Sequence, residues 1–89
     1  MRAIVTVTAK DQVGIIANVA NTLSKLQINV LDLSQTVLQE YFVMIMLTDI
    51  SACTISFAQL NDFLQKSGQE SGLDIRIQRE DIFNAMHRI

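Results

Sequence analysis

The sequence is poor in the residues from which catalytic and metal sites are most often built. Its 89 residues include one histidine, one cysteine and no tryptophan. The single cysteine, Cys53, excludes an internal disulfide and any zinc site that needs several cysteines. One unpaired thiol fits a reducing compartment.

Proline is absent and glycine occurs only three times, so the usual turn signals are sparse. No stretch has the composition of a linker or of a low-complexity segment. A chain of 89 residues has room for one hydrophobic core. We therefore expect a single domain over 1–89.

Neither charge nor hydropathy points to a nucleic acid or a membrane. The net charge is −2, and the seven basic residues are scattered: Arg2, Lys10, Lys25, Lys66, Arg76, Arg79 and Arg88. Without a basic stripe, binding to nucleic-acid phosphates is not expected. The longest apolar run, 42–47, is far shorter than the roughly 20 residues of a membrane helix. Thr6 and Thr8 interrupt the apolar N-terminal stretch, so it does not resemble a signal peptide. We expect a cytoplasmic protein without membrane contact.

Residue spacing divides the first half of the chain into a strand, a helix and a second strand. Residues 2–9 are rich in β-branched side chains, which favours a strand. Asp11 is suited to cap the helix that follows, and apolar residues at helical spacing predict that helix over 13–26. Residues 29–38 alternate between apolar and polar, which indicates a strand with one apolar face and one solvent-exposed face.

The second half repeats this order. Residues 39–40 form a short turn into a third strand, 41–48, whose two faces are both apolar. A strand of that kind lies in the middle of a sheet and needs cover on both sides. Ser56 and Gln59 match a capping box at the start of a second helix, which we expect to end at Gly68.

The chain ends in a fourth strand and a third helix. Residues 73–78 alternate between apolar and polar, and 80–89 return to helical spacing. The order β-α-β-β-α-β predicts a ferredoxin-like α+β sandwich, in which both helices lie on one face of a four-stranded antiparallel sheet, plus a C-terminal helix. The third strand should be central, and the second and fourth should lie at the edges.

The apolar content predicts association between copies. Nearly half of the residues (49%) are apolar, which is a large supply for so small a chain. One face of the third strand must point away from the helices, either Phe42, Met44 and Met46 or Tyr41, Val43, Ile45 and Leu47. Either face is too apolar for solvent unless the C-terminal helix or a second subunit covers it. We expect a homo-oligomer, most simply a two-fold dimer.

No group of residues forms a recognisable catalytic site. The first strand–helix loop, 10–14, lacks the two cysteines of copper chaperones with this topology and the phosphate-binding arginine of acylphosphatases. RNA-binding versions stack bases on aromatic residues of the central strands, and here only Tyr41 and Phe42 are available, on opposite faces. His87 has no nucleophile to pair with and is interpreted as solvated or capping, and Cys53 as incidental. We expect no catalysis, no metal and no cofactor.

Gly14 is the one unusual residue of this loop. It falls in the first turn of a predicted helix, where glycine costs about 1 kcal/mol relative to alanine. It could let backbone amides approach a negatively charged ligand, or it could let the helix pack tightly on the sheet. The residues alone leave both interpretations open.

The segments DQVGIIANV (11–19) and INVLDLSQ (28–35) resemble the signature of the ACT domain family. The variant is similar to that of formyltetrahydrofolate deformylase and of the glycine-cleavage transcriptional repressor. It is most similar to that of short stand-alone prokaryotic ACT proteins. By element order the resemblance covers about 1–79, and the ending 81–86 also looks like those stand-alone proteins.

The resemblance implies a regulatory domain in which an amino acid lies between two subunits. In such domains the ligand is held by backbone amides of the first loop and by the polar residue that opens strand two. The ligand-binding residues carried over to this chain are Asp11, Gln12, Val13, Gly14, Ile15 and Asn29. A ligand carboxylate suits a helix N-terminus, and asparagine can both donate and accept. Asn29 equally fits a turn residue that tolerates unusual backbone angles.

The alternative function is a protein-interaction module that docks a larger enzyme or regulator without a ligand. An enzyme is the third and most distant possibility. We expect the first loop of one subunit to face Asn29 of the other, because the two positions flank opposite ends of the predicted first helix.

Overall fold

The computed structural model describes residues 1–10 and 15–86, and its elements confirm the predicted order. The first half comprises β1 (Arg2–Lys10), α1 (Ile15–Lys25) and β2 (Asn29–Leu38). The second half comprises β3 (Tyr41–Asp49), α2 (Phe57–Ser71), β4 (Asp74–Arg79) and α3 (Glu80–Met86).

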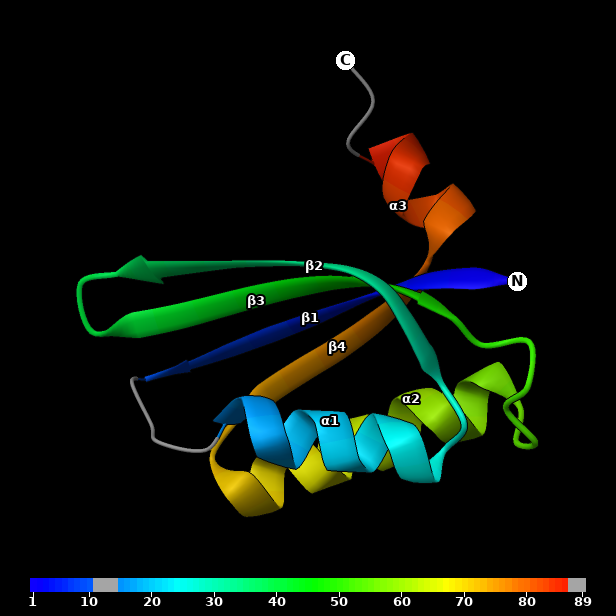
Figure 1. Cartoon of the computed structure of the whole chain (residues 1–89), viewed down its shortest axis with the longest axis horizontal. Coiled ribbons are helices and arrows are strands. Elements are labelled where there is room, and N and C mark those ends of the chain that lie inside the picture. The colour runs from blue at the N-terminus through cyan, green and yellow to red at the C-terminus, as the bar shows by residue number, and fades with distance from the viewer. Residues whose placement is uncertain (11–14, 87–89) are drawn as a thin grey trace.

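The four strands form one antiparallel sheet in the order β2-β3-β1-β4. The predicted ferredoxin-like arrangement is therefore confirmed, with β3 central and β2 and β4 at the edges. Helices α1 and α2 lie side by side against one face of the sheet, and α3 rises from the opposite side (Figure 1). We call the face covered by α1 and α2 the inner face and the other the outer face.

The core lies between the inner face and the two helices. Val5 and Val7 of β1 are fully buried, and the strand register places them opposite Met46 and Met44 of β3. The helices contribute buried residues at helical spacing: Val19 and Leu23 from α1, and Leu60 and Leu64 from α2. These apolar side chains hold the helices on the sheet because they leave water together.

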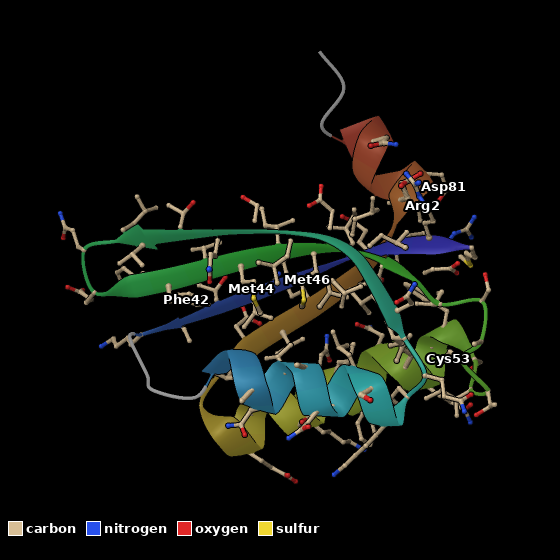
Figure 2. All side chains as sticks on the ribbon, viewed as in Figure 1. Arg2, Phe42, Met44, Met46, Cys53 and Asp81 are labelled. Atoms are coloured by element: carbon tan, nitrogen blue, oxygen red, sulfur yellow. The ribbon has the colours of Figure 1, made fainter. Side chains whose placement is uncertain are left out.

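The structure decides which face of β3 is covered. Phe42, Met44 and Met46 belong to the inner face and pack in or against the core (Figure 2). Tyr41 and Ile45, on the outer face, keep 45% and 41% of their surface exposed. The predicted cover for the outer face is thus not provided by α3, which leaves these side chains open.

Thr48 is the one buried polar residue of the described core. Its hydroxyl donates a hydrogen bond of 2.9 Å to the backbone carbonyl of Ala3, its cross-strand partner. The hydroxyl is therefore satisfied without water, and it links the two central strands near the end that carries the N-terminus.

Helices α1 and α2 end in the same way. In α1, the N–H groups of Gln27 and Ile28 donate to the carbonyls of Ser24 and Leu23. In α2, the corresponding donors are Gly72 and Leu73, which bond to Gln69 and Gly68. This pair of bonds is the Schellman motif, in which one residue adopts left-handed backbone angles. That residue is Gly72 in α2 (φ 74°) and Gln27 in α1 (φ 58°).

The prediction that α2 ends at Gly68 is wrong. The helix continues to Ser71, and Gly68 is a buried residue inside it. A Cβ atom at Gly68 would lie 2.8 Å from the carbonyl oxygen of Leu73 and 3.2 Å from Cγ1 of Ile75. The glycine is therefore required for the close approach of α2 to β4 and not for ending the helix. The capping box of Ser56 and Gln59 at the other end of α2 is confirmed.

We expect Gly68→Ala to destabilise the protein by about 1–3 kcal/mol, because the new methyl group would press on a backbone carbonyl that cannot rotate away. Urea denaturation would show a lower midpoint with an unchanged slope. Glu70→Ala, at an exposed position of the same helix, serves as the control and should shift the midpoint far less. Equal midpoints for the two variants would contradict the packing role of Gly68.

We expect Gln27→Gly to stabilise the protein by about 1 kcal/mol, because glycine adopts left-handed angles without the steric cost that glutamine carries. Gly72→Ala places the opposite change in the matching position of α2 and should destabilise. Thermal unfolding of both variants measures the pair. A melting temperature of Gln27→Gly at or below that of the wild type would show that the angle at Gln27 is not strained.

Candidate functional site

The predicted ligand residues fall in two places. Four of them, Asp11, Gln12, Val13 and Gly14, lie outside the described residues. Ile15 is the first residue of α1, and Asn29 opens β2 with its surface exposed. The strand start that was predicted to carry Asn29 is therefore confirmed, while the ligand role of these residues stays a prediction.

Within one chain, Ile15 and Asn29 are far apart. They lie at opposite ends of α1, whose 11 residues correspond to about 16 Å of helix. The chain turns directly from the end of α1 into β2 through Leu26, Gln27 and Ile28. A small ligand that contacts both Ile15 and Asn29 must therefore contact two different copies of the chain.

Asn29 lies beside a polar cluster that the sequence did not identify. Its direct partner across the β2–β3 pairing is Asp49. The Asp49 carboxylate accepts hydrogen bonds from the hydroxyl (2.6 Å) and the backbone N–H (2.9 Å) of Ser51. The N-terminal ammonium of Met1 donates to the Ser51 hydroxyl at 2.8 Å and lies 3.9 Å from the carboxylate. Only the strand register reveals this grouping, since Asn29 and Asp49 are distant in sequence.

These contacts hold the Asp49 carboxyl in its charged form. The hydrogen bond from the Ser51 hydroxyl, then that from the Ser51 N–H, lower the pKa of Asp49, and the N-terminal ammonium adds a smaller effect in the same direction. The carboxylate is therefore ionised at neutral pH. The N-terminal ammonium already lies beside this carboxylate, so part of its negative charge is compensated within the chain.

The other residues that could carry chemistry do not gather into a site. Cys53 is half-buried and packs against the core between β3 and α2 (Figure 2), and His87 lies outside the described residues. Across residues 1–10 and 15–86, no three His, Cys, Asp or Glu side chains come together as metal ligands. None of the helices within these ranges is long and apolar enough to cross a membrane.

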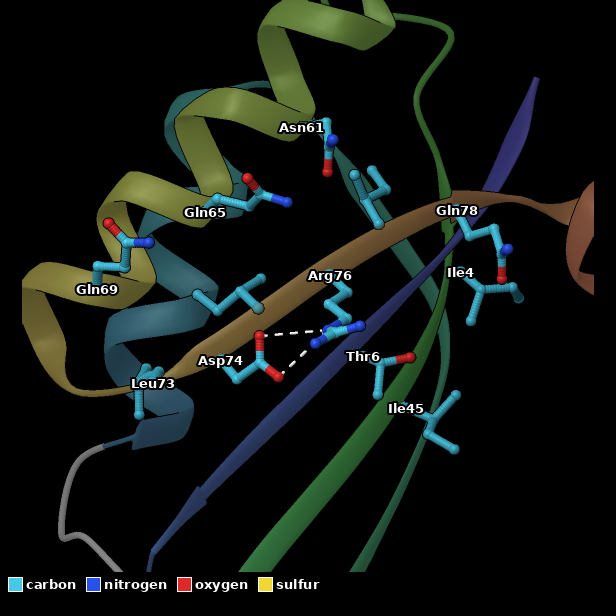
Figure 3. A pocket seen from close by; sticks show the side chains of 12 residues that line it. Ile4, Thr6, Ile45, Asn61, Gln65, Gln69, Leu73, Asp74, Arg76 and Gln78 are labelled. Atoms are coloured by element: carbon cyan, nitrogen blue, oxygen red, sulfur yellow. Dashed lines mark hydrogen bonds and ion pairs between the residues drawn. The ribbon is translucent and has the colours of Figure 1, made fainter.

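A hollow of the described structure lies away from Asn29 and Ile15. A groove of about 990 Å³ follows β4, between the amide side chains of Asn61, Gln65 and Gln69 on α2 and the outer-face residues of the sheet (Figure 3). Asp74 and Arg76 form an ion pair of 3.2 Å in it, and both side chains are largely exposed. An exposed ion pair of this kind contributes little to stability, and the open groove buries no charge that a ligand would have to neutralise.

Comparison with known proteins assigns the chain to a family. The family model described as the ACT domain matches residues 2–78. The chain belongs to the ACT domain family. A UPF0237 protein of Clostridium acetobutylicum is 52% identical over 89 residues, with both chains covered in full. An ACT domain protein from Streptococcus pneumoniae has a TM-score of 0.84 at 40% identity, with 98% of each chain covered.

A larger enzyme contains the same fold. A formyltetrahydrofolate deformylase from Pseudomonas putida superimposes with a TM-score of 0.77 over 91% of this chain, but over 29% of its own length and at 12% identity. This similarity shows the ACT fold alone. The S. pneumoniae and C. acetobutylicum relatives match this chain from end to end, so the predicted similarity to short stand-alone ACT proteins is confirmed. Membership of the family indicates a regulatory, ligand-binding module in general.

The lowered pKa of Asp49 predicts an acid-sensitive contribution to stability. A carboxyl whose pKa is lower in the folded than in the unfolded state stabilises the fold above its unfolded pKa, and this stabilisation is lost as the pH falls through the folded pKa. We expect Ser51→Ala to raise the pKa of Asp49 toward its ordinary value, as measured by NMR titration of the carboxyl carbon. Ser56→Ala, which removes a serine bonded to Gln59 instead, should leave that pKa unchanged. A pKa unaffected by Ser51→Ala would contradict the assignment.

Proposed function

We propose that this ACT protein is a regulatory module that binds an amino acid between two copies of the chain. The observation that carries the proposal is the separation of Ile15 and Asn29 by the length of α1, because a ligand that contacts both positions needs a second copy. The ligand-contacting residues of the proposal are Asp11, Gln12, Val13, Gly14 and Ile15 of one copy and Asn29 of the other.

The exposed edge of β2 is the surface that we propose for this dimer. All ten residues of β2 are exposed, and the strand pairs with β3 on one side only. Leu33 and Val37 belong to the inner face, opposite Met46 and Phe42, yet they remain 41% and 65% exposed because the helices do not reach them. A long apolar edge strand with unpaired backbone groups readily pairs with another chain.

A two-fold axis beside β2, perpendicular to the sheet, would bring the two ends of the site together. Such an axis runs β2 antiparallel to β2 of the second copy and α1 antiparallel to α1. The beginning of one α1 then lies near the end of the other, where the chain enters β2 at Asn29. This arrangement makes two equivalent sites per dimer.

The chemistry of the two ends suits the polar groups of an amino acid. The N-terminus of α1, which begins at Ile15, favours a carboxylate because the first N–H groups of a helix have no partner within the helix and the helix dipole is positive there. At the other end, the side chain of Asn29 can both donate and accept hydrogen bonds, so it can bind another polar group of the ligand. No catalytic role is part of the proposal, and a cytoplasmic location stays a prediction.

We expect one or more common amino acids to raise the melting temperature of the wild-type protein and to tighten its association, because a ligand held between copies stabilises the dimer by mass action. Asn29→Ala should weaken binding by roughly 1–3 kcal/mol, since it leaves a ligand group without its hydrogen bond. Gly14→Val should block the approach to the loop amides. A thermal-shift screen, followed by calorimetry of wild type and both variants, measures these effects.

Two results would contradict parts of the proposal. Unchanged amino-acid affinity in both variants would place the ligand elsewhere. A screen without any shift would favour the second candidate function, a module that docks a larger enzyme or regulator, which the exposed β2 edge also suits. Asp62→Ala, at an exposed position of α2, the helix that packs on β4 at the opposite edge of the sheet, is the matched control and should bind as the wild type does.

A further inference from the structure

The outer face of the sheet carries an apolar stripe that none of the elements within residues 1–10 and 15–86 covers. Tyr41, Val43, Ile45 and Leu47 follow one another along β3 on this face. Tyr41 and Ile45 are 45% and 41% exposed, and Val43 and Leu47 are half-buried. Contiguous apolar patches of this kind mark interaction surfaces in soluble proteins.

The strand register arranges the residues beside the stripe by type. The β2 neighbours of Ile45 and Val43 are Ser34 and Thr36, and their β1 neighbours are Thr6 and Thr8. On β4 the next neighbours are Arg76, beside Thr6, and Asp74, beside Thr8. The Ile45 row thus ends in Arg76 and the Val43 row ends in Asp74, and these two exposed side chains form an ion pair with each other within the chain.

This order makes the outer face complementary to itself. Consider a second copy that packs on this face, related by a two-fold axis that runs perpendicular to the strands, between the Ile45 row and the Val43 row. Each strand then lies over the same strand of the second copy, in the opposite direction. Ile45 then faces Val43 of the second copy, and Thr6 faces Thr8. Arg76 faces Asp74 of the second copy, twice per pair, so opposite charges meet at the edge.

The other in-plane axis gives a poorer match. A two-fold axis along the strands would lay β3 over β1 and β2 over β4. Ile45 would then face Thr6, and Ser34 would face Arg76. Apolar side chains would cover hydroxyl groups, and Arg76 and Asp74 would meet no opposite charge of the second copy. The apolar stripe and the ion pair therefore both favour the axis that crosses the strands.

The position of α3 fits the same arrangement. This helix leaves β4 after Arg79, which is aligned with Ala3 and Thr48, at the opposite end of β3 from Tyr41. It rises from the outer side of the sheet there (Figure 1), held by an ion pair between Arg2 and Glu80. Because each strand lies over its own copy, the crossing axis brings the start of β4 and the end of β1 of the second copy to this end, beside α3.

We propose that the outer face binds a second copy of this chain, sheet against sheet, through the β3 stripe and the reciprocal Arg76–Asp74 contacts. This contact goes beyond the proposed function, since it uses the opposite side of the molecule from α1 and is separate from the β2 edge. With both contacts in place, the protein assembles beyond a dimer.

The reciprocal charges give a direct test. Asp74→Arg puts two positive charges at each end of the contact, and Arg76→Asp puts two negative charges there. Each variant alone should associate through this face at least tenfold more weakly than the wild type and lose one step of assembly in sedimentation velocity at about 50 μM, the binding scale expected of such patches. An equimolar mixture of the two variants should regain that step, because opposite charges then meet.

The controls separate this contact from the other effects. Asp62→Arg and Lys66→Asp make the same charge changes in an exposed ion pair of α2, on the inner side of the sheet, and should leave the assembly unchanged. If Asp74 and Arg76 served only the fold of their own chain, the mixture would regain nothing, and the proposal would be wrong. A monomeric wild type at 50 μM, or variants that assemble like the wild type, would also overturn it. Ligand-induced thermal shifts should persist in both charge variants, which distinguishes failure here from failure of the amino-acid site.

Discussion

The packing of α1 and α2 against β1 and β3 determines which surfaces remain for other partners. The buried Val5, Val7, Met44 and Met46 form the centre of that contact. Helix α1 has 11 residues, or about 16 Å, whereas the ten residues of β2 extend for roughly 30 Å. The β2–β3 turn therefore reaches past the helices (Figure 1), and both β2 and the outer face are left open. The exposed apolar surface of β2 follows from this difference in length, whereas the outer face is open because α1 and α2 both lie on the other side of the sheet.

The elements were predictable because each carries its own local pattern. The two apolar faces of β3 identified it as a central strand, and the capping box at Ser56 identified the beginning of α2. The end of α2 was not predictable in the same way. Gly68 and Gly72 are equally plausible terminal residues in the sequence, and the choice depends on a distant contact with Leu73 and Ile75. The left-handed angles of Gln27 also have no sequence signal, since glutamine rarely adopts them.

Individual residues of the candidate site were predictable from the sequence, but the residues that lie next to them in the fold were not. The family resemblance selected Asn29, but nothing near it in sequence indicates Asp49 or the N-terminal ammonium. That grouping depends on the register of β2 against β3, which shifts at a bulge between Val30 and Asp32. Register is set by the packing of the whole sheet and by such bulges, so it cannot be predicted from short stretches of the sequence. The arrangement of Arg76 and Asp74 beside the apolar stripe of the outer face likewise depends on strand register.

A site shared between copies changes how a regulator of this size can work. A chain of 89 residues buries a modest share of its surface, so contacts between copies add appreciably to its stability. If the ligand binds only the assembled form, ligand binding and association of the copies are thermodynamically linked. Each of these two equilibria must then strengthen the other by the same factor. The sheet and its helices need not change shape for this to occur. The concentration of an amino acid would then be reported as the fraction of assembled chains, and a partner that recognises a surface present only in the assembly would receive the signal.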